Sequence, residues 1–186
     1  MAIQDTARRK VTYEDYALIP EDLQRHEILD REHYVTPSPP LLHQTVSGNL
    51  LLKLAPFVRE HRLGKVIHAF FDVLLSEHDI VQPDLLFISK ERVAILTKAN
   101  AQGAPDLLIE ILSEPTRIRD ETLKRDRYER YGVLEYWVVD PENGVVRVYR
   151  RAGDFCAPRE LSAAAGDVLP TPLLPGLEIR VGEVFE

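Results

Sequence analysis

The chain has 186 residues, of which 45% are hydrophobic, and its formal net charge is −7 at pH 7. This composition suits one globular domain with a substantial core, so we expect residues 1–186 to form a single unit with residues 1–10 loosely attached. The acidic charge argues against a sequence-independent nucleic-acid binder, which usually needs a basic surface. No apolar run approaches the roughly 18 residues that span a bilayer and the start lacks a signal peptide's apolar stretch, so we expect a cytoplasmic protein.

The first half of the chain predicts two hairpins separated by a long helix. The expected elements are a short helix at 12–19, a hairpin at 25–36 turning near Asp30 and Arg31, a helix at 41–64, and a hairpin of two β-rich runs at 65–76 and 80–89. The long helix is indicated by Val46, Leu50 and Leu54, followed by Phe57 or Val58, which recur at spacings of three and four. Its face should therefore be buried.

The second half predicts a buried strand, a charged helix and a third hairpin. The expected elements are a short helical or irregular stretch at 90–103, a strand at 105–113, a helix around 120–131 ending at Gly132, a hairpin at 134–151 and short edge strands from Val168 onward. The third hairpin turns at Asn143-Gly144, which is a strong turn signal. This order of elements predicts a mixed α/β sheet with helices packed on it.

Three carboxylates, Asp84, Asp106 and Glu110, lie within or beside apolar strands, where an uncompensated charge is costly. Asp106 and Glu110 are four residues apart on one strand, about 13 Å, which is too far to share a metal. Asp84 belongs to an expected neighbouring strand about 4.8 Å away, so Asp84 and Glu110 can converge on one cation. Asp106 is more easily read as the first residue of its strand, accepting backbone hydrogen bonds.

Lys124 is the candidate for a cation that orients water or stabilises negative charge beside such a metal. It follows Glu110 by 14 residues, which leaves room for a connector and the first turn of a helix that returns over the sheet. Tyr128 and Tyr131 share its side of that helix, which predicts an inward face. The alternative is that Lys124 pairs with Asp120 at i, i+4 on a solvated surface.

Together these stretches resemble the PD-(D/E)XK nuclease superfamily and, within it, the Uma family of restriction endonucleases. The resemblance covers residues 13–149 and is carried by "HEILD", "PSPPLLH", "VQPDLLFIS", "APDLLIEILSEPT" and "D...K...Y..YGVLEYWVVDP". It implies a restriction-endonuclease-like mixed sheet flanked by helices. A hairpin would carry the aspartate and the next strand the glutamate.

The resemblance assigns catalytic roles to Asp84, Glu110 and Lys124, with Asp84 and Glu110 as metal ligands. The superfamily lysine normally comes two residues after the acid, where this chain has Leu112, so the lysine would have moved to the following helix. The chain also has Arg31 where the family usually has a turn glycine. Further accessory groups lining the site would be Glu27, His43 and Tyr128. The alternatives for Glu27 and His43 are a strand-edge residue and a helix-start residue bonded to backbone.

Two functions follow as hypotheses. One is a Mg²⁺- or Mn²⁺-dependent endonuclease acting on DNA, in which Arg117, Arg119 and Arg127 contact flanking phosphates. The other is a nuclease-fold binding or regulatory module without turnover. A serine or cysteine hydrolase is disfavoured, because Ser113 and the single cysteine, Cys156, lack a recognisable nucleophile setting. A homodimer or higher homo-oligomer is expected if both DNA strands are cut.

Overall fold

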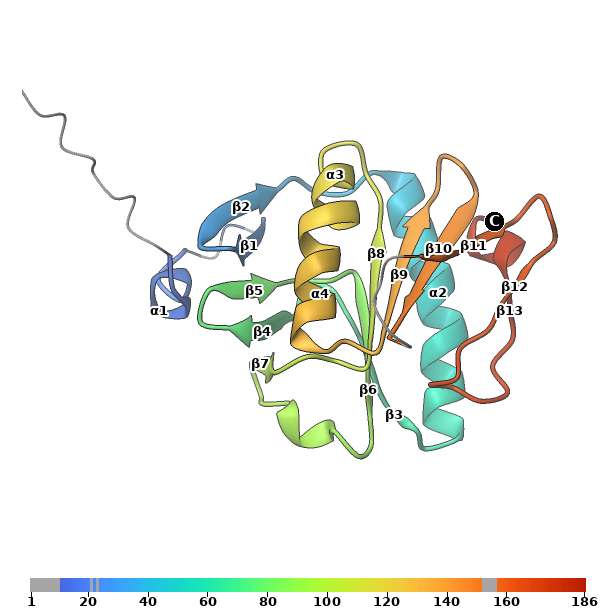
Figure 1. The fold of residues 1–186 in the computed structure, drawn as a ribbon, viewed down its shortest axis with the longest axis horizontal. Coiled ribbons are helices and arrows are strands. Elements are labelled where there is room, and N and C mark those ends of the chain that lie inside the picture. The colour runs from blue at the N-terminus through green and yellow to red at the C-terminus, as the bar shows by residue number, and fades with distance from the viewer. Residues whose placement is uncertain (1–10, 21, 23, 152–156) are drawn as a thin grey trace, which may run out of the picture.

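The computed structural model describes residues 11–20, 22, 24–151 and 157–186. The expected loose segment at 1–10 and Cys156 lie outside these residues. Within the described part of the chain, no helix is both long enough and apolar enough to cross a membrane. The predicted mixed α/β class is confirmed, with helices on both faces of a mixed sheet (Figure 1).

The larger sheet has six strands in the order β11-β10-β9-β8-β6-β3. Its members are β3 (Gly64–His68), β6 (Leu85–Ser89), β8 (Leu107–Ile111), β9 (Glu135–Asp140), β10 (Val145–Arg150) and β11 (Arg159–Ser162). Only β8 and β9 run parallel among its pairs, because the charged helix crosses over between them. The expected central strand is therefore confirmed as β8, buried at every position.

Two helices cover opposite faces of this sheet (Figure 1). On one face α2 (Leu41–Glu60) buries Val46, Leu50, Leu54 and Val58 against the sheet, as the spacing predicted. On the other face lies α4 (Arg125–Tyr131), whose Tyr128 joins a second apolar cluster. Strand residues alternate between the two clusters because successive side chains point to opposite faces.

The charged helix begins earlier than expected and is not regular. It opens with α3 (Arg117–Arg119), continues as a π-helical segment (Asp120–Lys124) and ends in α4. Gly132 terminates it at φ 88°, a left-handed conformation that glycine adopts without steric cost. Such π-helical turns are frequent at functional sites.

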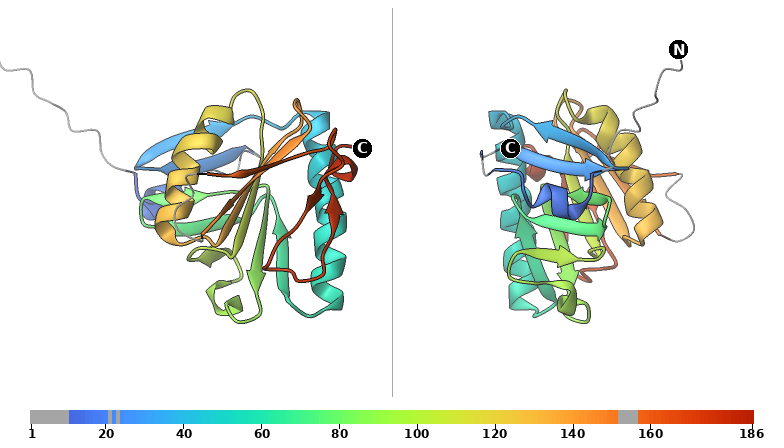
Figure 2. Two further views of the ribbon diagram at one scale, coloured as in Figure 1. Left: turned by 45° about the vertical axis from the view of Figure 1, so that its right-hand side comes forward. Right: turned by 90° about the vertical axis from the view of Figure 1, so that its left-hand side faces the viewer.

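A second sheet of five strands has the order β2-β1-β5-β4-β7 and stands in front in the right-hand view of Figure 2. Its members are β1 (Arg25–Leu29), β2 (Glu32–Thr36), β4 (Asp72–Ser76), β5 (Asp79–Val81) and β7 (Asn100–Gln102). The β1–β2 turn at Asp30 and Arg31 has positive φ at both residues, as a tight hairpin turn requires. This hairpin is confirmed.

The expected two-stranded hairpin at 65–89 is wrong in one respect. Each of its two runs is broken into two strands, so β4 pairs with β5 in the smaller sheet while β3 pairs with β6 in the larger one. The break in the second run has a physical cause at Gln82 and Pro83. Pro83 has no N–H to donate, and the Gln82 N–H donates to Glu27 Oε1 at 3.0 Å instead of to a strand.

The remaining elements are short. They are α1 (Tyr13–Tyr16), η1 (Val93–Ile95), β12 (Val168–Leu169), β13 (Ile179–Arg180) and η3 (Val181–Val184). The tail strands β12 and β13 pair with each other in a separate sheet rather than extending a larger one, which corrects the edge-strand expectation. Leu169, Leu174 and Ile179 join the core on the α2 side, so the tail covers its own domain.

Candidate active site

A cluster of four buried carboxylates lies where the two sheets meet the charged helix. We call it the carboxylate cluster, and its members are Glu27 of β1, Asp84 just before β6, Glu110 of β8 and Asp120 of the π-helical segment. Each is at most 2% exposed. Because a buried carboxylate is costly unless it is compensated, four together require cations or protons.

Asp84 is held beside Glu110 by the backbone. Its Oδ2 accepts a hydrogen bond from the Ile111 N–H at 2.7 Å, one residue along β8 from Glu110. The same Oδ2 lies 3.2 Å from His43 Nε2, and Oδ1 lies 2.5 Å from Arg25 Nη2. Arg25 also reaches Glu110, with Nη1 4.0 Å from Oε2. Asp84 and Glu110 therefore flank one guanidinium.

Lys124 lies among the other three carboxylates. Its Nζ is 2.9 Å from Glu27 Oε1, 3.0 Å from Glu110 Oε1 and 3.3 Å from Asp120 Oδ1. One turn further along the helix, the Tyr128 hydroxyl donates to Glu110 Oε1 at 2.6 Å. The pairing of Lys124 with Asp120 thus exists, but in the interior and not on a solvated surface.

The two accessory residues expected at the N-terminal side also reach the cluster. Glu27 is fully buried and is a partner of Lys124, not a strand-edge residue. His43, in the first turn of α2, contacts Asp84 through Nε2. Its Nδ1 has no hydrogen-bond partner among the described residues, so the backbone-bonded alternative is not what the structure shows. Tyr131 diverges from Tyr128 and donates to Asp79 Oδ2 in the smaller sheet.

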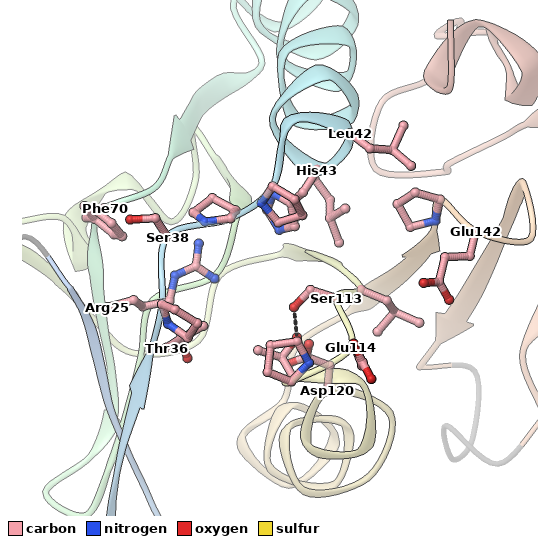
Figure 3. A pocket seen from close by; sticks show the side chains of 18 residues that line it. Arg25, Thr36, Ser38, Leu42, His43, Phe70, Ser113, Glu114, Asp120 and Glu142 are labelled. Atoms are coloured by element: carbon pink, nitrogen blue, oxygen red, sulfur yellow. Dashed lines mark hydrogen bonds between the residues drawn. The ribbon is translucent and has the colours of Figure 1, made fainter.

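A cavity of about 310 Å³ reaches the cluster from outside (Figure 3). Arg25, His43 and Asp120 line it, while Phe70 and Leu42 contribute apolar wall. The lining comes from β1, the end of β2 and the segment to α2, the first turn of α2, the β3–β4 connection, the β8–α3 connector, the π-helical segment and the β9–β10 turn. A substrate group entering here would meet the carboxylate cluster at its Arg25 side.

Comparison with known proteins identifies a family and a shared fold. Residues 13–182 match the model of a family named Uma2 and described as "Putative restriction endonuclease". The chain belongs to the Uma2 family. A search of curated proteins gave no match.

Among solved structures, the chain is similar to a crystal structure from Anabaena variabilis ATCC 29413, described as "a putative nuclease belonging to DUF820". The TM-score is 0.81 and the sequence identity 19%, and the match covers 94% of this chain and 97% of that one. The likeness shows a shared fold. Membership in the Uma2 family supports a nuclease.

This Uma2 chain has Leu112 where the superfamily normally has its lysine, and the structure explains the difference. Leu112 packs in the apolar cluster beneath α4, and the amine reaches Glu110 from Lys124 instead. A charged group at position 112 would have to replace that apolar contact.

The three arginines expected at DNA are all engaged within the chain. Their partners are Asp140 and Glu142 for Arg117, Thr36 and Glu27 for Arg119, and Asp30 and Asp79 for Arg127. Arg119 and Arg117 are linked to the cavity through their partners Thr36 and Glu142, which line its wall.

Burial and charge set the protonation of the cluster. Burial raises the pKa of Glu110 to about 8; Lys124 opposes this rise and neighbouring carboxylates add to it. Burial would also raise the pKa of Asp84, but the hydrogen bond with His43 and the charge of Arg25 hold it well below its usual range. The pKa of Lys124 is raised because the surrounding carboxylates outweigh its burial. Asp84 is therefore ionised while Glu110 can hold a proton.

The donor set fits a hard divalent cation. Carboxylate oxygens are the ligands that Mg²⁺ and Mn²⁺ prefer, and Mg²⁺ is commonly held by one or two carboxylates plus water and phosphate. Among the described residues, no group of three or more His, Cys, Asp and Glu side chains is arranged to hold a metal alone. Asp84 and Glu110 would supply the two carboxylates of that pattern, with water and phosphate as the remaining ligands. Glu27 Oε2 and Asp120 Oδ1 have no hydrogen-bond partner among the described residues, and their nearest cations are Arg119 at 3.5 Å and Lys124 at 3.3 Å.

Sequence reasoning missed Arg25. The residue lies two positions before Glu27 on β1, and side chains two apart on a strand share a face. Because Glu27 was expected at the site, the same alternation predicts that the Arg25 side chain points toward it. Asp120 was seen only as a surface partner of Lys124.

Proposed function

We propose that this Uma2 chain is a divalent-metal-dependent endonuclease that hydrolyses phosphodiester bonds of DNA. The observation that carries the proposal is the convergence of Asp84 and Lys124 on Glu110 and its strand, in contact with Arg25 and Asp120, which line the cavity. Asp84 and Glu110 would hold Mg²⁺ or Mn²⁺. When bound, such an ion polarises the phosphate and lowers the pKa of a coordinated water.

The chain's own side chains have separate roles in this proposal. Lys124 stabilises negative charge that develops on the phosphate, or orients the attacking water, from its position 3.0 Å from Glu110 Oε1. Glu27 and Asp120 fix the Lys124 ammonium, and the Tyr128 hydroxyl fixes the Glu110 carboxylate. Locked partners of this kind hold catalytic groups in place without reorganisation during the reaction.

DNA contact at Arg117, Arg119 and Arg127 remains part of the proposal. Arg119 hydrogen-bonds Thr36 at 2.7 Å and Arg117 hydrogen-bonds Glu142 at 2.8 Å, and both partners line the cavity. Arg117 and Arg127 would have to exchange a carboxylate partner for a phosphate. A homodimer is proposed as the form that cuts both strands, because each chain carries one cluster.

The test is cleavage of plasmid and oligonucleotide DNA in Mg²⁺, Mn²⁺ or EDTA by wild type, Asp84→Asn and Glu110→Gln. The matched control is Asp106→Asn, a buried carboxylate that accepts from the Ser89 N–H at 2.7 Å and pairs with Arg92, away from the cluster. We expect metal-dependent cutting that falls about 100-fold or more in the two cluster variants and persists in the control. Equal cutting by all four proteins would indicate a contaminating nuclease and refute the proposal.

A nuclease-fold module without turnover is the second candidate. It is favoured by one observation, the Arg25 guanidinium between Asp84 and Glu110. If Arg25 stays between Asp84 and Glu110, a divalent ion has no access to these two carboxylates. Intact DNA under every metal condition, together with metal-independent binding of a labelled oligonucleotide, would support this candidate instead.

A further inference from the structure

Arg25 occupies the place that a metal bridging Asp84 and Glu110 would need. Its Nη2 is 2.5 Å from Asp84 Oδ1 and its Nη1 is 4.0 Å from Glu110 Oε2. Lys124 contacts the other three carboxylates of the cluster, and no contact between Lys124 and Asp84 is found among the described residues. Arg25 is thus the cation that serves the Asp84 side of the cluster.

Charge balance argues against Arg25 and a divalent ion occupying the site at the same time. The four carboxylates face Lys124, Arg119 and Arg25, so the sum over these seven groups is one negative charge when all of them are ionised. Replacing the guanidinium by a divalent ion makes this sum zero. Adding the ion while Arg25 stays makes it positive, and two cations a few ångströms apart in a buried site repel strongly.

The cavity beside Arg25 offers space into which its side chain could move. Its side chain lines the cavity of about 310 Å³, and its Cζ lies 5.9 Å from the centroid of the Phe70 ring, which is itself on the cavity wall. A guanidinium that left Asp84 could move along this ring into the cavity without unfolding β1. There it would face an incoming phosphate rather than a carboxylate.

We propose that Arg25 is an internal substitute for the metal: it pairs with Asp84 beside Glu110 in the metal-free protein and must move into the cavity when a divalent ion binds. This inference rests on the proposed function, since it assumes the same two ligands. Arg25 is a positioning residue in this scheme and sets the metal affinity of the site. Because it competes with the ion, removing it should strengthen metal binding, whereas loss of a merely structural residue would weaken binding or leave it unchanged.

Calorimetric titration with Mn²⁺ alone, on metal-free full-length protein, tests this. We expect Arg25→Gln to bind Mn²⁺ at least tenfold more tightly than wild type, about 1.4 kcal/mol. The matched control is Arg92→Gln, which likewise removes an arginine from a buried aspartate, Asp106, at 3.1 Å but outside the cluster. Its Mn²⁺ affinity should equal that of wild type.

Thermal unfolding supplies a second readout. Arg25→Gln should melt below wild type in EDTA, and saturating Mn²⁺ should remove most of that difference because the ion replaces the lost charge. If Arg25→Gln does not fold in EDTA, Arg25→Lys carries the test. Its single ammonium cannot span both carboxylates as a guanidinium does, so we expect at least threefold tighter Mn²⁺ binding than wild type.

The outcomes separate this inference from the proposed function. If wild type binds Mn²⁺ through Asp84 but the Arg25 variants bind it equally or more weakly, the inference is wrong and the proposed function stands. If wild type and Arg25→Gln both show no Mn²⁺ binding, the metal-dependent function and the inference fail together.

Discussion

Two clusters of buried charge meet the same helix and differ in how their carboxylates are satisfied. At the end of β9, Asp140 accepts two hydrogen bonds from Arg117, at 2.7 and 3.1 Å, and two from Asn143, at 2.8 and 3.3 Å. We call this the Asp140 cluster. Although burial opposes it, these hydrogen bonds lower the pKa of Asp140 to about 2. In the carboxylate cluster, burial instead raises the pKa of Glu110 to about 8.

The contrast separates charge that stabilises the fold from charge that can bind something. A carboxylate with every lone pair used has no remaining capacity for a cation. The carboxylate cluster has four acids against three arginine and lysine side chains, and two of its oxygens are held by ion pairs without a hydrogen bond among the described residues. Clusters of perturbed acids with a specific charge partner are more typical of active sites than of structural ion pairs.

The largest expected effect is at Lys124. Replacing it by methionine leaves Glu27, Glu110 and Asp120 without their shared cation, and breaking a buried pair in this way costs about 3–5 kcal/mol. Urea unfolding in EDTA measures the change in the free energy of unfolding. The double variant Lys124→Met, Glu110→Gln should recover part of the loss, and a loss below about 1 kcal/mol for the single variant would contradict the arrangement.

Asp140→Asn should also lower the free energy of unfolding, but by less than Lys124→Met does. It should leave the rate of DNA cleavage unchanged. It removes charge-assisted hydrogen bonds from Arg117 while keeping the shape of the side chain, which costs about 2 kcal/mol. At saturating DNA, where altered binding through Arg117 has no effect, the rate of cleavage by the folded protein should equal that of wild type, opposite to Glu110→Gln. A selective loss of cleavage at full stability would place Asp140 in the active site and remove the distinction between the clusters.

The two clusters should respond to pH in opposite directions. The folded protein keeps a proton on Glu110 up to about pH 8, whereas the ordinary value is 4.5, so the unfolded state binds fewer protons between these limits. Stability should therefore fall as pH rises from 4.5 to 8, by at most about 1.4 kcal/mol per pH unit for one proton. Asp140 acts below this range: its pKa is about 2 rather than 3.8, so its contribution is lost as pH falls through those values.

Urea unfolding of wild type and Glu110→Gln at pH 5, 6, 7 and 8 in EDTA measures the first effect. The variant lacks the titrating proton, so its stability should vary less over this range than that of wild type. Parallel profiles for the two proteins would show that the pKa of Glu110 is not raised.

The elements of this fold that depend on local sequence were predicted correctly. The helix of Val46, Leu50 and Leu54 and the turn at Asn143-Gly144 rest on periodicity and turn chemistry, which act over a few residues. The division into two sheets was missed because it depends on which strands meet in space. Pro83 was a local sign of the break, but the Glu27 carboxylate that takes the Gln82 N–H comes from 55 residues away.

The same limit applies to the site. Strand spacing sufficed to bring Asp84 beside Glu110, and the connector length sufficed to return Lys124 over them. The position of Arg25 could not be derived in this way, because it requires the smaller sheet to meet the larger one at Asp84. Nor does residue type reveal the π-helical segment that turns Asp120 and Lys124 inward together.

The smallest effect is expected at Glu142, the exposed arm of the Asp140 cluster. Its carboxylate lies 2.8 Å from Arg117 Nη2, as short as the buried contacts, yet its side chain is 69% exposed. Water and salt screen such a pair, and Arg117 keeps both bonds to Asp140 when the arm is removed. Glu142→Gln should therefore change the free energy of unfolding by less than about 0.5 kcal/mol, against about 2 kcal/mol for Asp140→Asn in the same urea titration. Equal losses would mean that Arg117 is held by its exposed partner, and that distance rather than burial decides which acids stabilise this helix.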